Sequence, residues 1–373
     1  MRKKKVSQHT QEVLQSEWKS DFMSKYFNEK LSGLEAYTPG EQPQDKKYIK
    51  LNTNESPYPA SKAVVDAITK EEIEDLRLYC DPECKKLKTA FAELYGVKSE
   101  NIFLSNGSDD ILNFAFLGFG QNGAVYNDIT YGFYKVFAEL HGIKSTIIPL
   151  NEDFTIDTNA FKSHNKLVVI ANPNAPTGIA LDLDVIEEIV ASNPKSVVLI
   201  DEAYVDFGGN SCYKLTEKYD NLLCVGTFSK SRSMAGARLG FAIGNKELID
   251  DLEKIKYSTN PYNINRLTQT AGLACVKDND YYMQNCKRII ETRGFVTEEL
   301  TKLGFTVLDS KANFIFAKSD KISGKELYLK LKENGVLVRH FESSRICEYN
   351  RITIGSREEM ETFILKVKEI LGV

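Results

Sequence analysis

Short apolar runs alternate with amphipathic stretches of helical length through the first two-thirds of this 373-residue chain. The runs at residues 101–105, 166–171, 196–200 and 222–225 are apolar at nearly every position, which predicts strands that are buried on both faces. Such strands, separated by helices, form parallel sheets with a helical layer on each side. The sequence therefore predicts an α/β domain built on a doubly covered, mostly parallel sheet.

The pattern changes after residue 256. Longer helical patterns at 266–276, 281–303 and 325–334 are interleaved with short strands, and the last helix opens with a capping box formed by Ser356 and Glu359. This order is typical of a smaller α+β domain. We therefore expect four parts: a polar N-terminal arm (1–30), a segment joining the small domain and a dimer interface (31–60), a large cofactor-binding domain (61–262), and a small C-terminal α+β domain (263–373).

The composition excludes several classes of function. A formal net charge of −4 gives no reason to expect nucleic-acid binding. No apolar run approaches membrane-spanning length, and the basic start is not followed by the apolar stretch of a signal peptide, so we expect a cytoplasmic protein. The seven scattered cysteines and four dispersed histidines show no metal-ligand spacing. The cysteines are therefore expected to be reduced thiols.

Several polar side chains follow the predicted strands directly. Ligands of parallel α/β sheets bind where the carboxyl ends of the strands meet, and Ser108, Asn174, Asp201 and Lys230 all lie at such ends. Lys230, in T-F-S-K, suits a Schiff-base site, because a neighbouring cation or a dry pocket lowers the pKa of a lysine and frees its amine to attack an aldehyde. The alternative is a surface loop with ordinary basic residues.

Other residues near these strand ends fit a pyridine cofactor. Asp201 would need a cationic partner when buried, and a protonated pyridine nitrogen is one, although a helix cap or a salt bridge is the ordinary explanation. Tyr204 could donate its hydroxyl to the ring oxygen, and Tyr131 could stack on the ring face. The turn at Gly107 and Ser108 opens a helix, and free N–H groups at such a start bind anions.

Five motifs occur in one order: S-N-G-S-D-D, N-P-N-A-P-T-G, D-E-A-Y, T-F-S-K-S-R-S-M-A-G-A-R-L-G and N-R-I-T-I-G-S-R-E-E. This set resembles the fold type I, pyridoxal-phosphate-dependent aminotransferases, and most closely their histidinol-phosphate aminotransferase branch. The resemblance covers residue 31 to the C-terminus. It implies a seven-stranded large domain with a smaller second domain, a homodimer, and the transfer of an amino group from histidinol phosphate to 2-oxoglutarate in histidine biosynthesis.

The resemblance also implies roles for individual residues. Lys230 would bind the cofactor covalently and then carry a proton, while Asp201 would pair with the pyridine nitrogen and Tyr204 with the phenolic oxygen. Arg351 would bind the carboxylate of glutamate, and Arg339 would help hold the phosphate of the substrate; a surface pair of Arg339 with Glu342 is the alternative. The resemblance further implies that the cofactor phosphate is held by Gly107, Ser108, Asp109, Ser229, Arg238 and the partner subunit's Tyr58. It implies that the cofactor ring contacts Tyr131 and Asn174, and that the substrate contacts Tyr37 and Asn54.

One position departs from the family pattern. The motif usually reads N-P-x-N-P-T-G, and its second asparagine, which binds the phenolic oxygen, is Ala175 here. Asn174 or Asn172 could substitute, or Tyr204 could act alone. Three other functions stay open: a decarboxylase of a phosphorylated amino acid such as threonine phosphate, an aminotransferase of aromatic or other amino acids, and a non-catalytic regulator that binds the cofactor.

Overall fold

The computed structural model describes residues 24–373. Within this part of the chain the large sheet has seven strands in the order β2-β8-β7-β6-β5-β3-β4. Strand β8 is antiparallel to both of its neighbours, and every other adjacent pair is parallel, which confirms the predicted mostly parallel sheet. The strands are β2 (Ile102–Ser105), β3 (Ala124–Asn127), β4 (Ser145–Ile148), β5 (Leu167–Ala171), β6 (Val198–Asp201), β7 (Leu222–Thr227) and β8 (Gly240–Gly244).

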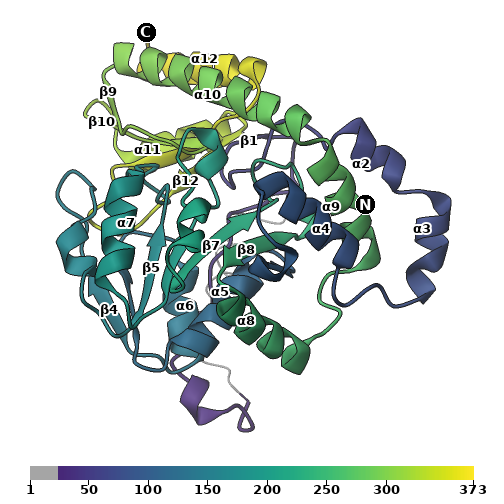
Figure 1. The fold of residues 1–373 in the computed structure, drawn as a ribbon. Helices are drawn as coiled ribbons and strands as arrows, with labels where there is room; N and C mark the ends of the chain where they lie inside the picture. Colours follow the sequence, from purple (N-terminus) through teal and green to yellow (C-terminus); the bar gives the residue numbers. More distant parts are fainter. Residues whose placement is uncertain (1–23) are drawn as a thin grey trace.

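Helices cover both faces of this sheet (Figure 1). Successive strand residues enter opposite cores: Leu199 of β6 packs with the helices of one face, and Val198 and Ile200 pack with those of the other. This alternation requires apolar side chains at consecutive positions, as the sequence has them. The first face carries α5 (Ser108–Phe119), α6 (Phe133–Leu140) and α8 (Lys246–Thr259), and the second carries α4 (Lys85–Tyr95), α7 (Leu183–Ser192) and α9 (Arg266–Lys277).

A second, smaller sheet lies above the large one in Figure 1, beneath helices α10 and α12. Its order is β12-β13-β10-β9, all antiparallel. The capping box predicted at Ser356 and Glu359 is present at the start of α12. The elements are β9 (Phe305–Val307), β10 (Phe314–Ser319), β12 (Arg339–His340), β13 (Asn350–Thr353), α10 (Asn279–Lys302), α11 (Gly324–Glu333) and α12 (Arg357–Leu371).

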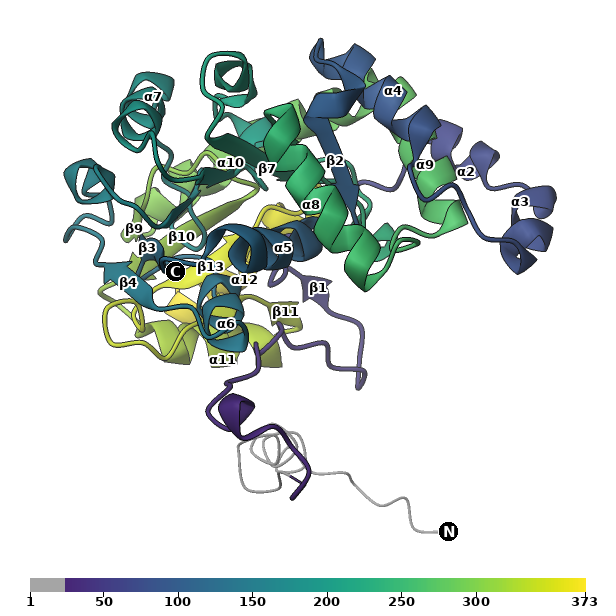
Figure 2. The same cartoon turned by 60° about the horizontal axis from the view of Figure 1, so that its bottom comes forward.

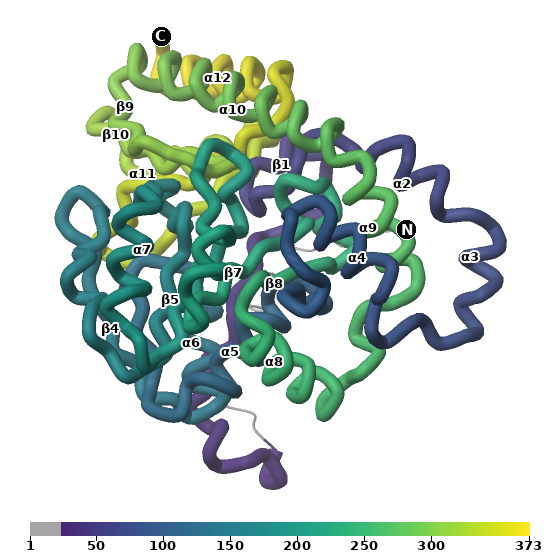
Figure 3. Tube along the Cα trace, in the orientation of Figure 1, coloured from purple at the N-terminus to yellow at the C-terminus, as the bar shows by residue number. Residues whose placement is uncertain are grey.

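The segment before α2 (Lys62–Ala67) and α3 (Lys70–Glu74) runs along the large domain to reach the small one (Figure 3). Its strand β1 (Ile49–Lys50) pairs in parallel with β11 (Val336–Leu337). Figure 2 shows the beginning of this segment, with the short helix η1 (Glu29–Leu31), projecting from the body of the protein. Most of the predicted arm, residues 1–23, lies outside the described residues.

The predicted boundary between the two large parts, near residue 262, stays a prediction. Helix α9, which follows it, packs against α2 and α4, and its Ala271 and Cys275 belong to the same core cluster as Phe91 of α4. Helix α10 packs instead against α12 and β9. Among the described residues no helix is both long and apolar enough to cross a membrane.

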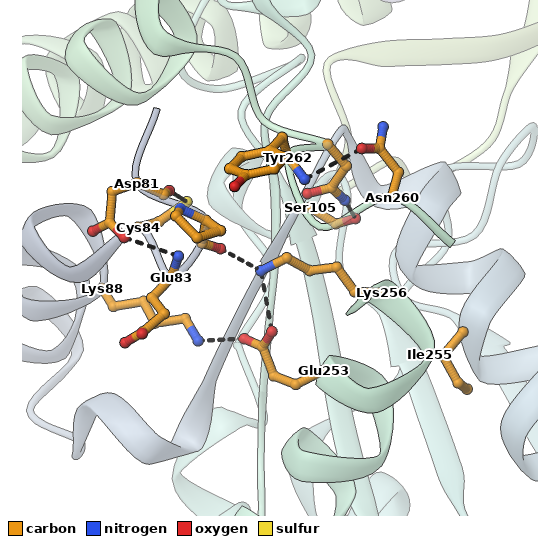
Figure 4. A network of polar contacts seen from close by, with 12 residues as sticks. Asp81, Glu83, Cys84, Lys88, Ser105, Glu253, Ile255, Lys256, Asn260 and Tyr262 are labelled. Carbon is orange, nitrogen blue, oxygen red and sulfur yellow. Dashed lines mark hydrogen bonds and ion pairs between the residues drawn. The ribbon is translucent and has the colours of Figure 1, made fainter. Parts of the chain in front are cut away.

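A fully buried lysine fixes the segment that precedes α4 (Figure 4). The Lys256 side chain is 0% exposed, and its Nζ donates to the carbonyl of Pro82 at 2.9 Å and lies 3.1 Å from the Glu253 carboxylate. Lys88 forms an ion pair with the other oxygen of Glu253. A buried cation is tolerated only when it is paired and hydrogen-bonded, and here both conditions are met.

We expect Lys256→Ala to lower the free energy of unfolding by about 3 kcal/mol, because removing one partner of a buried ion pair leaves polar groups without compensation. Lys254→Ala, at an exposed position of the same helix, is the matched control and should change it by less than about 0.5 kcal/mol. Urea denaturation followed by circular dichroism measures both. Equal effects of the two substitutions would contradict the stabilising role of the buried lysine.

Candidate active site

The predicted residues converge at the carboxyl edge of β6 and β7. Asp201 is the last residue of β6, and Lys230 follows β7 by three positions. The strands are parallel neighbours, with Asp201 beside Val225, so the two side chains emerge at the same edge of the sheet. Both residues lie where the sequence predicts them, at the carboxyl ends of neighbouring strands, and their roles in one site stay predictions.

Lys230 is held over an aromatic ring. Its Nζ donates to the carbonyl of Thr53 at 3.1 Å and lies 5.9 Å from the centre of the Tyr204 ring. Burial, and then the positive charge of Arg351, lower the pKa of Lys230 to about 8. A larger fraction of this amine is therefore neutral near pH 7 than for an ordinary lysine, as nucleophilic attack on an aldehyde requires.

Asp201 is a buried carboxylate, 5% exposed. Its Oδ2 accepts a hydrogen bond from the Tyr134 hydroxyl at 2.7 Å, and its Oδ1 accepts one from the backbone N–H of Ala203 at 3.2 Å. Burial raises the pKa of Asp201 to about 6, while these two donors act in the opposite direction. No salt bridge joins it to a cation among residues 24–373, so a cationic ligand group would supply the partner that it lacks.

Tyr204, whose ring lies near Lys230, is hydrogen-bonded to Asn54. The Asn54 amide donates to the Tyr204 hydroxyl at 3.0 Å, although 150 residues separate them. Asn54 itself is buried, and its amide oxygen accepts a hydrogen bond from Thr353. Ala175, at the position where the family motif has asparagine, packs in an apolar cluster with Phe314 against Tyr204. Asn54, predicted as a substrate residue, thus contacts Tyr204.

The anion site predicted at the start of α5 is assembled around Arg238. Its NH2 group lies 3.0 Å from the Asp109 carboxylate, and its NH1 group donates to Ser229 Oγ at 3.3 Å. Gly107, at the N-cap, has a φ of +85°, and a Cβ there would lie 2.5 Å from Arg238. Only glycine leaves room for this approach of the guanidinium to the helix N-terminus. Ser108 is the first residue of α5.

An aromatic wall borders the site. The Tyr131 hydroxyl donates to the other oxygen of Asp109 at 2.8 Å. Tyr37, from the N-terminal segment, stacks on Phe133 with 4.3 Å between ring centres and lies 6.1 Å from the Tyr131 ring. Residues far apart in the chain therefore form one surface of rings, on which a planar ligand can stack.

Two arginines lie opposite each other in the small sheet, Arg339 of β12 and Arg351 of β13. Their guanidinium groups lie 5.7 and 5.9 Å from the centre of the Phe341 ring. Loss of hydration raises the pKa of Tyr37, and the positive charges of these two arginines act against that shift. Arg339 donates to the carbonyls of Thr38 and Pro39, and Glu342 lies 3.4 Å from Lys325, not beside Arg339. The Nε of Arg351 is buried without a hydrogen-bond partner. This pair leaves donors for an anionic ligand.

Two predicted residues make other contacts. Asn174 lies in the loop after β5, where its amide donates to the carbonyl of Ile129 and accepts from the Thr130 hydroxyl. The side-chain oxygen of Asn172 accepts from the backbone N–H of Leu181. Tyr58 packs under Arg288 of α10, with 5.0 Å from the guanidinium to the ring centre. The cofactor roles of Asn174 and Tyr58 stay predictions.

Sequence reasoning missed Tyr134, the residue that donates to Asp201. The available signal was its position three residues after Tyr131, which allows both rings to lie on one side of the turn that opens α6. A pattern of this kind is far more often a core stripe, and Tyr134 is in fact fully buried. Its hydrogen bond to a strand end 67 residues away could not be read from the chain.

Comparison with known proteins agrees with this geometry. The family model for aminotransferase class I and II matches residues 46–367. The chain belongs to the class I and II aminotransferase family. Among its relatives is the histidinol-phosphate aminotransferase of Brachyspira hyodysenteriae, which is 53% identical over 352 residues, covering 94% of this chain and 99% of the relative.

Solved structures of class I and II aminotransferases share the fold. The histidinol-phosphate aminotransferase from Clostridium acetobutylicum matches with a TM-score of 0.80 and 26% identity, covering 87% of this chain and 99% of that one. The enzyme from Sinorhizobium meliloti, solved in complex with pyridoxal-5'-phosphate, matches with a TM-score of 0.83 over 94% of this chain and 98% of that one. At 21% identity, the second comparison establishes the fold alone.

The residues present fit pyridoxal phosphate, the cofactor of this family. Asp201 lacks a cation that the protonated pyridine would supply, Lys230 offers an amine of lowered pKa, and Arg238 stands at a helix N-terminus suited to a phosphate. A different polar cluster, Glu202 with Cys212 and Cys224, is buried beside β6. Its two sulfurs lie 3.1 Å apart.

We expect Lys230 to hold the cofactor covalently. Incubation with pyridoxal phosphate, followed by borohydride reduction and peptide mapping, should label the peptide that carries Lys230. Because only the neutral amine reacts, the initial rate of labelling should rise with pH through about 8 and level off above it. Lys230→Arg should abolish the label, Lys254→Arg should retain it, and a label on another lysine would exclude this assignment.

Proposed function

We propose that this protein is a pyridoxal-phosphate-dependent aminotransferase that converts histidinol phosphate and 2-oxoglutarate to imidazole acetol phosphate and glutamate, a step of histidine biosynthesis. The amine of Lys230, placed beside the buried Asp201 in a chain 53% identical to a histidinol-phosphate aminotransferase, carries this proposal. The contacts of Asp201, Lys230 and Arg238 at this edge of the sheet are compatible with the roles that the family resemblance implies for them.

Each part of the site has a task in this reaction. Bound pyridoxal phosphate supplies an electron sink for the carbon that bears the amino group. The Lys230 amine would take the proton from that carbon and deliver it to C4′ of the cofactor. The Asp201 carboxylate keeps the ring nitrogen protonated, and the Tyr204 hydroxyl donates to the phenolic oxygen. Arg238, Ser229 and the N-terminus of α5 hold the phosphate.

The substrates differ in where their negative charge lies. Histidinol phosphate has a phosphate and no α-carboxylate, whereas glutamate has carboxylates only. Arg339 and Arg351, paired across β12 and β13, would bind the phosphate in one half-reaction and a carboxylate in the other. The aromatic wall of Tyr37 and Tyr131 suits an imidazole ring.

The proposed active unit is a homodimer. Five large apolar side chains on and after α2 and α3 are more than a third exposed, as is Tyr262 after α8. Tyr79 and Tyr262 stack on each other with 4.4 Å between ring centres. An apolar surface of this kind is typical of a subunit interface. We assign the partner subunit's Tyr58 to the phosphate site, as the family resemblance implies. The residues of this face are Val65, Ile73, Leu76, Leu78, Tyr79 and Tyr262.

We place the enzyme in the cytoplasm. The seven cysteines, all within the described residues, are free thiols, including the adjacent pair Cys212 and Cys224. Free thiols in contact are compatible with a reducing compartment. The net charge of −4 gives no reason to propose nucleic-acid binding.

A substrate panel tests the reaction. Purified protein with pyridoxal phosphate, histidinol phosphate and 2-oxoglutarate should form glutamate, and Asp201→Ala should reduce turnover about 100-fold or more, because the ring nitrogen loses its counter-ion. Release of carbon dioxide from threonine phosphate without use of 2-oxoglutarate would favour the decarboxylase. Cofactor binding without turnover of any substrate would favour the regulator.

Arg339→Ala tests the substrate. The substitution should raise the KM for histidinol phosphate by roughly 10- to 100-fold, since a hydrogen bond to a charged group contributes about 1.5–3 kcal/mol. The KM for an unphosphorylated aromatic amino acid should change far less. Arg357→Ala, whose exposed guanidinium pairs with Glu361, is the control and should change neither. If phosphate-free substrates react as well as histidinol phosphate in the unmutated enzyme, only the aminotransferase assignment survives.

A further inference from the structure

Tyr134 is a buried hydrogen-bond donor whose acceptor is the carboxylate at the centre of the site. Its side chain is 0% exposed, and its hydroxyl lies 2.7 Å from Oδ2 of Asp201. The other carboxylate oxygen, Oδ1, accepts from the N–H of Ala203 at 3.2 Å. Each oxygen of Asp201 thus has one donor from the protein, and both retain lone pairs for a ligand.

Two tyrosines three residues apart lie at the start of α6: Tyr131 is two positions before the helix, and Tyr134 is in its first turn. Tyr131 donates to Asp109 at the start of α5, and Tyr134 donates to Asp201 at the end of β6. The two rings meet edge to face with 5.7 Å between their centres. The start of α6 therefore connects the carboxylate of the anion site with the carboxylate that faces the cofactor ring.

The ring of Tyr134 cannot easily leave this position. It stacks on Phe116 of α5 with 6.3 Å between ring centres and meets Tyr126 of β3 at 6.0 Å, inside the core between the sheet and its helices. Side chains packed at such density occupy one rotamer, so the hydroxyl has a fixed direction. The donor is supplied to Asp201 before any ligand binds.

We propose that Tyr134 is a positioning residue for the cofactor: its hydroxyl orients the Asp201 carboxylate and favours the ionised form that binds the ring nitrogen. This inference rests on the proposed function, because it requires a pyridine ring at Asp201. A buried carboxylate without donors tends to take up a proton, and a neutral acid could not pair with a protonated ring nitrogen. Burial, and then the contact with Asp201, raise the pKa of Tyr134 well above its ordinary value, so the phenol remains a donor.

The affinity of the protein for pyridoxal phosphate tests this role. Tyr134→Phe removes the hydroxyl and keeps the ring, and it should weaken binding, measured by equilibrium dialysis, about 10-fold or more. Tyr126→Phe is the matched control: Tyr126 is 2% exposed, lies in the same core, and its hydroxyl bonds Ser145 away from the site. It should change the affinity less than about 2-fold. Equal affinities of the two variants would overturn the proposal.

A double-mutant cycle separates positioning from general packing. If Tyr134 acts through Asp201, Tyr134→Phe should change the affinity by less than about 2-fold when Asp201→Ala is already present. An undiminished loss in that background would overturn the proposal. Should Tyr134→Phe fail to fold, a crystal structure of the unmutated holoenzyme decides, because a Tyr134 hydroxyl beyond hydrogen-bond distance of Asp201 would also overturn it.

These outcomes are independent of the substrate. An unmutated protein that binds pyridoxal phosphate but does not convert histidinol phosphate would contradict the proposed function and leave the comparison of the two variants valid. Normal turnover by the unmutated protein, with Tyr134→Phe indistinguishable from Tyr126→Phe in affinity, would retain the proposed function and remove only the positioning role.

Discussion

The buried carboxylate of Asp201 is the constraint on which the rest of the site depends. Placing an ion in a sheet core is costly unless donors and a counter-charge compensate it. The protein supplies two donors, from Tyr134 and from the backbone of Ala203, but no salt bridge within the described residues. This incomplete compensation is why we propose Asp201 as the partner of a protonated ring.

Burial lowers the pKa of Lys230, whereas it raises the pKa of Asp201. Removing the ammonium from water favours the neutral amine, whereas removing the carboxylate from water favours the neutral acid. Arg351 adds to the first effect, and the hydroxyl of Tyr134 opposes the second. Burial at one edge of the sheet thus favours the neutral amine of Lys230, while two hydrogen-bond donors favour the ionised carboxylate of Asp201.

The architecture explains how these groups meet. Parallel strands bring Asp201 and Lys230 to one edge, helix α5 directs its N-terminus there, and the small domain contributes Arg351 from β13. The segment through Asn54 crosses between the two domains and contacts Tyr204 and Thr353. A substrate that binds both Lys230 and the arginines therefore touches both domains, so the placement of the small domain affects the spacing of the reactive groups.

The sequence by itself determined the strands of the large sheet, the helix that begins at the capping box, and the strand-end positions of Asp201 and Lys230. These features depend on local periodicity and on capping, which neighbouring residues encode. The family motifs added the assignment of a cofactor and a substrate. Only the tertiary structure decided that Tyr134 reaches Asp201, that Asn54 binds Tyr204, and that α9 packs on α2 and α4. Each of these contacts joins residues far apart in the chain, and a buried tyrosine has the same local pattern whether or not its hydroxyl has a functional acceptor.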